Sequence, residues 1–180
     1  MIAMQCKKCQ LHKTRINIVH GQGNNKSNII LIGEAPGKNE DLQGIPFIGR
    51  AGKLLDELLS HINLTRKDVY TTNTVKCRPP NNRNPTTEEI KACTPHLDRE
   101  IAQIKPKIII PLGTFASKYI LEKYNFKFTT IGVCHGKKFY TPDLIIIPFY
   151  HPAAAIYNQK LKPELFKDIR KVKITIDENN

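Results

Sequence analysis

The sequence predicts an α/β protein in which a central, mainly parallel sheet of four strands lies between two layers of helices. Short apolar runs rich in β-branched residues are typical of strands buried on both faces. Amphipathic segments alternate with these runs, and no linker or low-complexity stretch divides the 180 residues. We therefore expect one three-layer α/β/α domain over residues 1–180, with strands at Ile29–Ile32, Val69–Val75, Lys107–Leu112 and Leu144–Phe149.

The first strand, Ile29–Ile32, ends in the Gly/Pro-rich turn Gly33–Gly37. Such a turn exposes backbone groups and the carboxylate of Glu34 at the edge of the sheet where α/β proteins bind ligands. Apolar residues then recur from Ala51 to Ile62 at the spacing of an amphipathic helix. The turn does not fit a Walker A loop, which has four residues between its glycines and a Ser or Thr after the Lys.

A Pro-rich loop, residues 76–85, follows the second strand, and a loop of this length inside a compact domain usually has a function. Thr86 and Glu89 form a capping-box pattern at the start of a helix whose apolar stripe ends at Ile104. This pattern predicts a long helix between the second and third strands.

The second half of the chain is expected to contain shorter elements. A helix should run from Thr114 to about Lys123. Two short strands, Phe126–Val133 and Lys137–Thr141, are expected on either side of a turn at Gly136. A basic helix over Pro163–Val172 should close the domain.

The turns after the expected strands indicate where a site would form. Parallel strands joined by right-handed crossovers place their carboxyl ends at one edge of the sheet. Four turns with glycine or polar residues should therefore converge at that edge: Gly33–Glu34, Asn73, Gly113 and His151.

The charge of the chain is typical of a protein that meets nucleic acid. Lys and Arg number 28 and Asp and Glu 16, which gives a formal net charge of +12. A lysine-rich solvated surface would give the same charge. No apolar run approaches the roughly 18 residues of a membrane span, and the N-terminus lacks a signal-peptide core. We expect a cytosolic protein with no membrane association.

Four of the five cysteines form two separated pairs. Cys6 and Cys9 make a C-x2-C pair, and Cys77 and Cys93 follow much later with fifteen residues between them. In a reducing compartment, clustered cysteines bind metal more often than they form disulfides. Four thiolates suit either tetrahedral zinc or a [4Fe-4S] cluster, although Cys93 alone also fits the apolar stripe of its helix. Cys134 stands apart and is taken as a non-ligand.

Five motifs together point to a family: Gly33–Gly37, Pro46–Gly52, Thr72–Pro80, Pro111–Gly113 and His151–Ala153. The chain resembles the iron–sulfur uracil-DNA glycosylases of family 4 from Cys6 to about Tyr157. The resemblance implies a uracil-DNA glycosylase-like fold, here in a monomer. It also implies a monofunctional enzyme that hydrolyses the N-glycosidic bond of a flipped-out deoxyuridine in single- or double-stranded DNA. The product is an abasic site, which begins base excision repair of deaminated cytosine.

The resemblance also implies roles for residues of the converging turns. Phe47 would be the floor on which the flipped uracil stacks, and Asn73 the amide that distinguishes uracil from cytosine. His151 would donate a hydrogen bond to uracil O2 as the base leaves. The implied uracil-binding residues are Gly33, Ala35, Gly37, Phe47, Asn73 and His151.

Glu34 is the expected catalytic carboxylate beside His151, because the reaction needs a negative group near the cationic sugar and the attacking water. Better-known uracil glycosylases carry an Asp where this chain has Ala35 and a Tyr where it has Gly37. The sequence therefore leaves open which carboxylate orients the attacking water, and the reserve candidates are Glu40 and Asp41.

Two further assignments come from the resemblance. The ligands of a structural [4Fe-4S] cluster would be Cys6, Cys9, Cys77 and Cys93, which would tie an N-terminal strap of residues 1–28 to the domain. The segment after His151 would be a loop that enters the minor groove of DNA through Pro152, Ala153, Ala154 and Ala155.

Two other functions are compatible with parts of this pattern. A catalytically silent module that binds DNA or uracil, with a structural cluster, would need neither Glu34 nor His151. A redox protein that uses the cluster would have no need of the base pocket.

Overall fold

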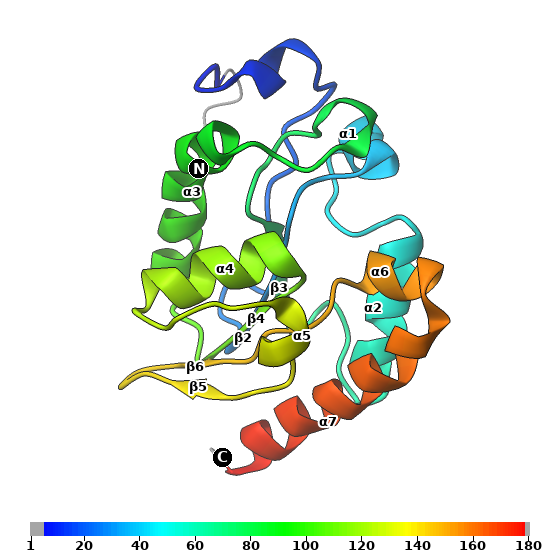
Figure 1. The fold of residues 1–180 in the computed structure, drawn as a ribbon, viewed down its shortest axis with the longest axis vertical. Helices are drawn as coiled ribbons and strands as arrows, with labels where there is room; N and C mark the ends of the chain where they lie inside the picture. The colour runs from blue at the N-terminus through cyan, green and yellow to red at the C-terminus, as the bar shows by residue number, and fades with distance from the viewer. Residues whose placement is uncertain (1–5, 179–180) are drawn as a thin grey trace.

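The computed structural model describes residues 6–178 and has the predicted α/β class (Figure 1). Its sheet contains six strands rather than the expected four, in the order β1-β3-β2-β4-β6-β5. The inner four are parallel and overlap the predicted strands, although three of them are shorter than predicted: β3 (Tyr70–Asn73), β2 (Ile29–Gly33), β4 (Ile108–Pro111) and β6 (Ile145–Ile146).

The two additional strands pair antiparallel at the edges of the sheet. They are β1 (Gln22–Gly23) and β5 (Phe139–Tyr140). At two residues each they are too short to show the alternation that marks a strand in sequence. β5 lies inside the predicted strand Lys137–Thr141 and extends the main sheet.

Apolar layers cover both faces of the sheet, because side chains alternate between the faces along each strand. Ile29 and Leu31 of β2 face one layer, whereas Ile30 and Ile32 face the other. Figure 1 shows the helices on the two sides. The first face is covered by α2 (Arg50–Ser60), α6 (Pro152–Tyr157) and α7 (Lys162–Glu178), and the second by α3 (Thr87–Ile104) and α4 (Thr114–Lys123).

Most helix predictions are confirmed. The capping box is present, with Thr86 Oγ1 accepting from Glu89 N and Glu89 Oε2 accepting from Thr86 N. The prediction of a strand at Phe126–Val133 is wrong. This segment is irregular and leads into the short helix α5 (Ile131–Cys134), because its aromatic side chains pack against the α3/α4 layer. The short helix α1 (Lys38–Gln43) was not expected.

The turns after the parallel strands meet at one edge, as predicted. Gly33 pairs with Asn73 in parallel register, and the next residues continue the connection. Thr74 N donates to Gly33 O at 2.8 Å, and Val75 N donates to Glu34 O at 3.0 Å. These bonds fix the turn after β2 against the turn after β3.

The N-terminal strap packs beside these turns. Of its predicted range, residues 1–5 lie outside the described part of the chain. Leu11 is buried against Val75 and Cys77, and Val19 N donates to Lys76 O at 2.8 Å. In Figure 1 the strap, drawn in blue, lies at the same end of the molecule as the start of α3.

Candidate active site and cysteine site

A pocket of about 420 Å³ opens at the carboxyl edge of the sheet, between the turn after β2 and the start of α6. It brings together the four residues to which the sequence assigns chemistry: Glu34, Phe47, Asn73 and His151. The remaining lining residues are Ala35, Pro36, Gly37, Glu40, Ala51, Pro79, Asn82, Arg83, Ala153, Ala154 and Tyr157.

Phe47 is fixed in a backbone conformation that side chains rarely adopt, with φ of +55°. Arg66 Nη2 donates to its carbonyl oxygen at 3.1 Å, and the Arg66 guanidinium carbon lies 5.7 Å from its ring centroid. A β-carbon at Gly52 would collide with the same carbonyl, so only glycine fits there. The buried ring therefore forms a rigid apolar wall of the pocket.

Asn73 ends β3 with a side chain that is almost fully buried. A β-carbon at Gly33 would collide with Asn73 Oδ1 and with Phe47 Cζ, so the two side chains converge over this glycine. In the part of the chain described, nothing hydrogen-bonds the Asn73 side-chain amide. Its donor and acceptor are thus available to a ligand.

His151 begins α6 and has a defined tautomer. Its Nδ1 accepts from Ala153 N at 3.1 Å, so the proton of the neutral ring lies on Nε2. Burial lowers the pKa of His151 to about 4, which keeps the ring neutral at physiological pH. Its ring is nearly parallel to that of Phe47, with centroids 6.3 Å apart and an interplanar angle of 23°.

Glu34 is half-buried in the turn after β2. Burial raises the pKa of Glu34 to about 7, because the charged carboxylate loses solvation there. Over residues 6–178 its side chain has no hydrogen-bond or ion-pair partner. A carboxyl group with this pKa can hold or accept a proton near neutrality.

The two reserve carboxylates have structural partners. Glu40 Oε1 accepts from Ile48 N at 3.1 Å and from Gly49 N at 2.8 Å, which fixes the loop before α2. Asp41 is buried, and its Oδ1 accepts from two backbone N–H groups of the strap, those of Ile16 and Asn17. Glu40 still borders the pocket, but Asp41 does not line it.

The segment predicted as a DNA-entering loop is the short helix α6. Two of its predicted contact residues, Pro152 and Ala155, are buried, and Ala155 packs into the apolar core. One face of the helix packs against the core, because His151 caps its N-terminus and Ala155 is buried among core residues. Its pocket-facing residues are Ala153, Ala154 and Tyr157, and the Tyr157 side chain is 88 % exposed.

The four predicted ligand cysteines surround a second, smaller cavity. Cys6 and Cys9 come from the strap, Cys77 from the loop after β3 and Cys93 from α3. Cys134 is buried elsewhere, in the α3/α4 layer. Three chain segments distant in sequence thus bring four sulfur atoms to one place.

Nitrogen donors approach these sulfurs. Arg15 Nη1 donates to Cys77 Sγ at 3.3 Å, and Lys76 N donates to Cys93 Sγ at 3.3 Å. His96 Nε2 lies 3.9 Å from Cys6 Sγ. Such donors stabilise thiolate ligands of metal centres.

Burial has the opposite effect on the thiols themselves. It raises the pKa of Cys93 to about 11 and also raises the pKa of Cys9 and of Cys77. Without a metal these groups are therefore thiols, and a bound metal would displace their protons.

Four cysteine side chains around one cavity suit either tetrahedral zinc or a [4Fe-4S] cluster. No group of three or more His, Cys, Asp or Glu side chains within residues 6–178 is close enough to hold one metal ion. The donor set around this cavity is compatible with either group.

Some residues of the site escape sequence reasoning. Arg66 lies nineteen positions after the Phe47 that it clamps, and no local pattern connects the two. Lys76 resembles any other lysine of a basic chain, although it is fully buried. The exposure of Tyr157 depends on α6 being a helix, which an alanine run after His-Pro could have suggested.

The fold and the pocket together define a class of α/β protein. Its pocket lies at the carboxyl edge of a parallel sheet, between an apolar wall and convergent polar groups, and suits a planar polar ligand. Within the described residues, no helix combines the length and apolar character needed to cross a membrane.

Comparison with known proteins identifies the family. Residues 20–172 match the model of the uracil DNA glycosylase superfamily. The chain is 51 % identical over 175 residues to a type-4 uracil-DNA glycosylase of Saccharolobus solfataricus, which covers 94 % of this chain and 81 % of the relative. Enzymes of that name from Archaeoglobus fulgidus and Thermotoga maritima are 47 % and 41 % identical, covering 94 % of this chain and 87 % and 88 % of their own. The chain belongs to the uracil DNA glycosylase superfamily, in its type-4 branch.

Proposed function

We propose that this protein removes uracil from DNA by hydrolysing the N-glycosidic bond, leaves an abasic site and so begins base excision repair of deaminated cytosine. The observation that carries the proposal is the convergence of Glu34, Phe47, Asn73 and His151 in one pocket. The names of the type-4 relatives support the same activity.

Base recognition follows from the shape and polarity of the pocket. The glycosidic bond cannot be reached inside a duplex, so the nucleotide must first leave the stack, at a cost of roughly a few kcal/mol. The flipped uracil then stacks on Phe47. The Asn73 amide can pair with O4 and N3–H of uracil, whereas cytosine presents the reverse pattern of donor and acceptor.

Bond cleavage separates charge, and Glu34 and His151 can each stabilise one of the two charges. As the C1′–N1 bond breaks, its electron pair stays on the base and the sugar becomes cationic. His151 donates its Nε2–H to uracil O2 and stabilises the anion without losing its proton. The Glu34 carboxylate faces the sugar, orients the water that attacks C1′ and accepts its proton.

We propose that Cys6, Cys9, Cys77 and Cys93 hold a [4Fe-4S] cluster. The support is the four-sulfur cavity and its nitrogen donors. The cluster would supply cross-links, connecting the strap and the loop after β3 to α3. No chemical step is assigned to it.

Cys93→Ala tests the cluster. We expect this variant to lose the broad visible absorption and most of the roughly four irons per chain, and to melt at a lower temperature, because three segments lose their connection. Cys134→Ala is the matched control and should keep its iron. Wild-type protein, prepared without oxygen, that contains zinc instead of iron would overturn the assignment.

The activity is tested with a labelled oligonucleotide carrying one uracil, as a single strand and opposite guanine or adenine, with thymine and cytosine controls. Alkali cleaves the strand only where an abasic site has formed. Uracil-specific cleavage would support a monofunctional glycosylase. No cleavage by iron-loaded protein would favour a catalytically silent module that binds uracil or DNA.

A further inference from the structure

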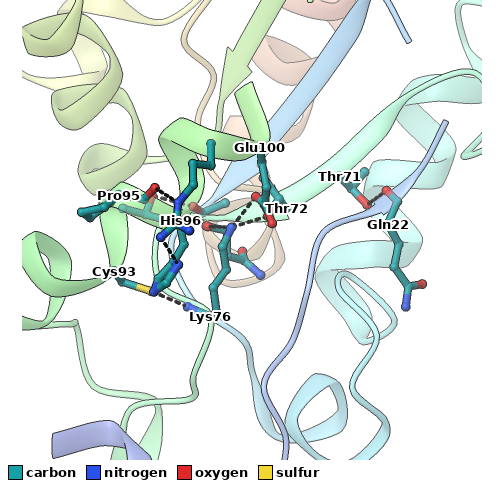
Figure 2. A network of polar contacts seen from close by, with 12 residues as sticks. Gln22, Thr71, Thr72, Lys76, Cys93, Pro95, His96 and Glu100 are labelled. Atoms are coloured by element: carbon teal, nitrogen blue, oxygen red, sulfur yellow. Dashed lines mark hydrogen bonds and ion pairs between the residues drawn. The ribbon is translucent and has the colours of Figure 1, made fainter. Parts of the chain in front are cut away.

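Lys76 is a buried lysine that contacts the main chain of the pocket residue Asn73. It lies three residues after Asn73, and its side chain is only 1 % exposed. Its Nζ donates to Asn73 O at 2.7 Å and to Thr72 Oγ1 at 2.5 Å, and it pairs with Glu100 Oε2 at 2.6 Å. Figure 2 shows this network between the end of β3 and α3. All three ammonium donors are therefore used.

The three side chains of this network all contact one another at the end of β3. Thr72 Oγ1 also donates to Glu100 Oε2 at 2.8 Å, so Lys76, Glu100 and Thr72 each contact the other two. Burying a charge pair is costly, and replacing it by apolar residues is often neutral or stabilising. A contribution to stability alone is thus a poor explanation for the pair.

The peptide between Asn73 and Thr74 is held from both sides. Lys76 Nζ binds the Asn73 carbonyl oxygen, while Thr74 N donates to Gly33 O at 2.8 Å. The side-chain amide of Asn73 makes no hydrogen bond to other described residues. Its position in the pocket is therefore set by its main chain and by packing.

We propose that Lys76, anchored by Glu100, is a positioning residue for base recognition. The inference rests on the proposed function and deepens it. Lys76 fixes the Asn73 main chain so that the amide meets the edge of uracil at one angle. A rigid amide is needed, because an amide free to rotate would accept cytosine as well as uracil.

The same residue connects the pocket to the cysteine site. Its backbone N–H donates to Cys93 Sγ, and its carbonyl accepts from Val19 N of the strap. Lys76 thus contacts the cysteine site through its backbone and the base-reading strand through its side chain.

Lys76→Met tests the proposal, since it keeps length and removes the ammonium. We expect kcat/KM for uracil excision to fall about 10- to 100-fold, the cost of a misplaced group. The inhibition constant of free uracil should rise by about the same factor. Affinity for abasic-site DNA and iron content should stay within about twofold of wild type, because neither depends on the Asn73 amide.

Lys171→Met is the matched control. Lys171 also pairs with a buried carboxylate, Asp168 at 2.9 Å, but it lies on α7 and does not line the pocket. Its loss should leave uracil inhibition unchanged. A similar rise in the uracil inhibition constant for both variants would overturn the proposal, because the effect would then follow from general destabilisation.

A second variant covers the case in which Lys76→Met fails to fold. The double substitution Lys76→Met/Glu100→Met leaves no unpaired carboxylate and should fold, yet keep the same loss of uracil affinity. Wild-type uracil affinity in the double variant would overturn the proposal.

The crystal structure of the double variant separates the two proposals. A displaced Asn73 carbonyl and amide would support the positioning role even if wild-type protein released no uracil, a result that would refute only the proposed function. An unmoved Asn73 in an active enzyme would refute the positioning role alone.

Discussion

Burial makes the Glu34 carboxyl group and the His151 imidazole both neutral between about pH 4 and about pH 7. It raises the pKa of Glu34 to about 7 and lowers the pKa of His151 to about 4, because the charged form of each loses solvation. Above about pH 7 the pocket holds a carboxylate beside a neutral imidazole. The proposed reaction needs this pair of charge states, one to face the cationic sugar and one to donate to the leaving base.

The rate of uracil release should therefore follow the ionisation of Glu34. We expect kcat/KM to rise about tenfold per pH unit below about pH 7 and to level off above it. His151 should cause no further change of kcat/KM above about pH 5, because its ring stays neutral there. Glu34→Gln should be slow and independent of pH. If kcat/KM of the wild-type enzyme did not change with pH across neutrality, a group other than Glu34 would activate the water.

Glu34 and Glu40 should affect stability in opposite directions. The folded pKa of Glu34 lies above its ordinary value of 4.5, so the native state binds the extra proton and stability falls as the pH rises from about 4.5 to about 7. Glu34→Gln should thus melt higher than wild type at about pH 8, with no difference below about pH 4.5. Glu40→Ala should melt lower, since Ile48 N and Gly49 N lose their acceptor.

Activity separates the same two substitutions. Glu34→Gln should lose far more single-turnover activity than Glu40→Ala, because Glu40 is engaged with the loop before α2. The reverse order would transfer the catalytic role to Glu40.

Among the elements, α6 is the one that we expect to contact DNA most directly. It is capped by His151 and anchored by buried Ala155, and it presents Tyr157 to solvent at the mouth of the pocket. A short helix of small residues lets its backbone approach the duplex closely. The exposed aromatic ring is then the group best suited to fill the space of a flipped nucleotide.

Tyr157→Ala should weaken excision from double-stranded DNA by about tenfold, because stacking of a base on an aromatic ring is worth about 1–3 kcal/mol. On single-stranded DNA the loss should be smaller, since no base-pair stack is left to fill. Tyr157→Phe is the matched control and should act like wild type. Equal losses on both substrates would place Tyr157 in the pocket rather than in the stack.

Elements with a long periodic pattern could be predicted, and those defined by tertiary pairing could not. α4 has the predicted bounds, Thr114–Lys123, and the capping box fixes the start of α3. By contrast, β1 contains two residues and exists because β3 offers it a free edge. The segment Phe126–Val133 has the composition of a strand, yet its aromatic residues are used to cover the core.

Across the whole molecule, the convergence of the turns could be predicted, but the separate roles of the residues in the site could not. Parallel topology alone brings Glu34, Asn73 and His151 to one edge. Sequence does not distinguish Glu34 from Glu40, because the difference arises from tertiary structure: two backbone N–H groups bind Glu40, whereas none of the described residues binds the Glu34 side chain. Lys76 could not be recognised for the same reason, since its partners come from β3 and α3.

The excess positive charge should act where the duplex passes, at the carboxyl edge of the sheet. Exposed Arg50 and Lys53 on α2 line a hollow beside α6. Exposed Lys26 and Lys107 precede β2 and β4 and line a hollow at the opposite edge. Two double substitutions to Ala, one at each edge, therefore remove equal charge from opposite sides.

We expect Arg50→Ala/Lys53→Ala to reduce the slope of log affinity against log salt concentration by about two for abasic double-stranded DNA, roughly one for each lost phosphate contact. Lys26→Ala/Lys107→Ala should leave the slope unchanged. Inhibition by free uracil should not depend on salt in either variant, because the base is uncharged. Equal changes of slope in both variants would mean that DNA binding depends on net charge rather than on the edge that contains the pocket.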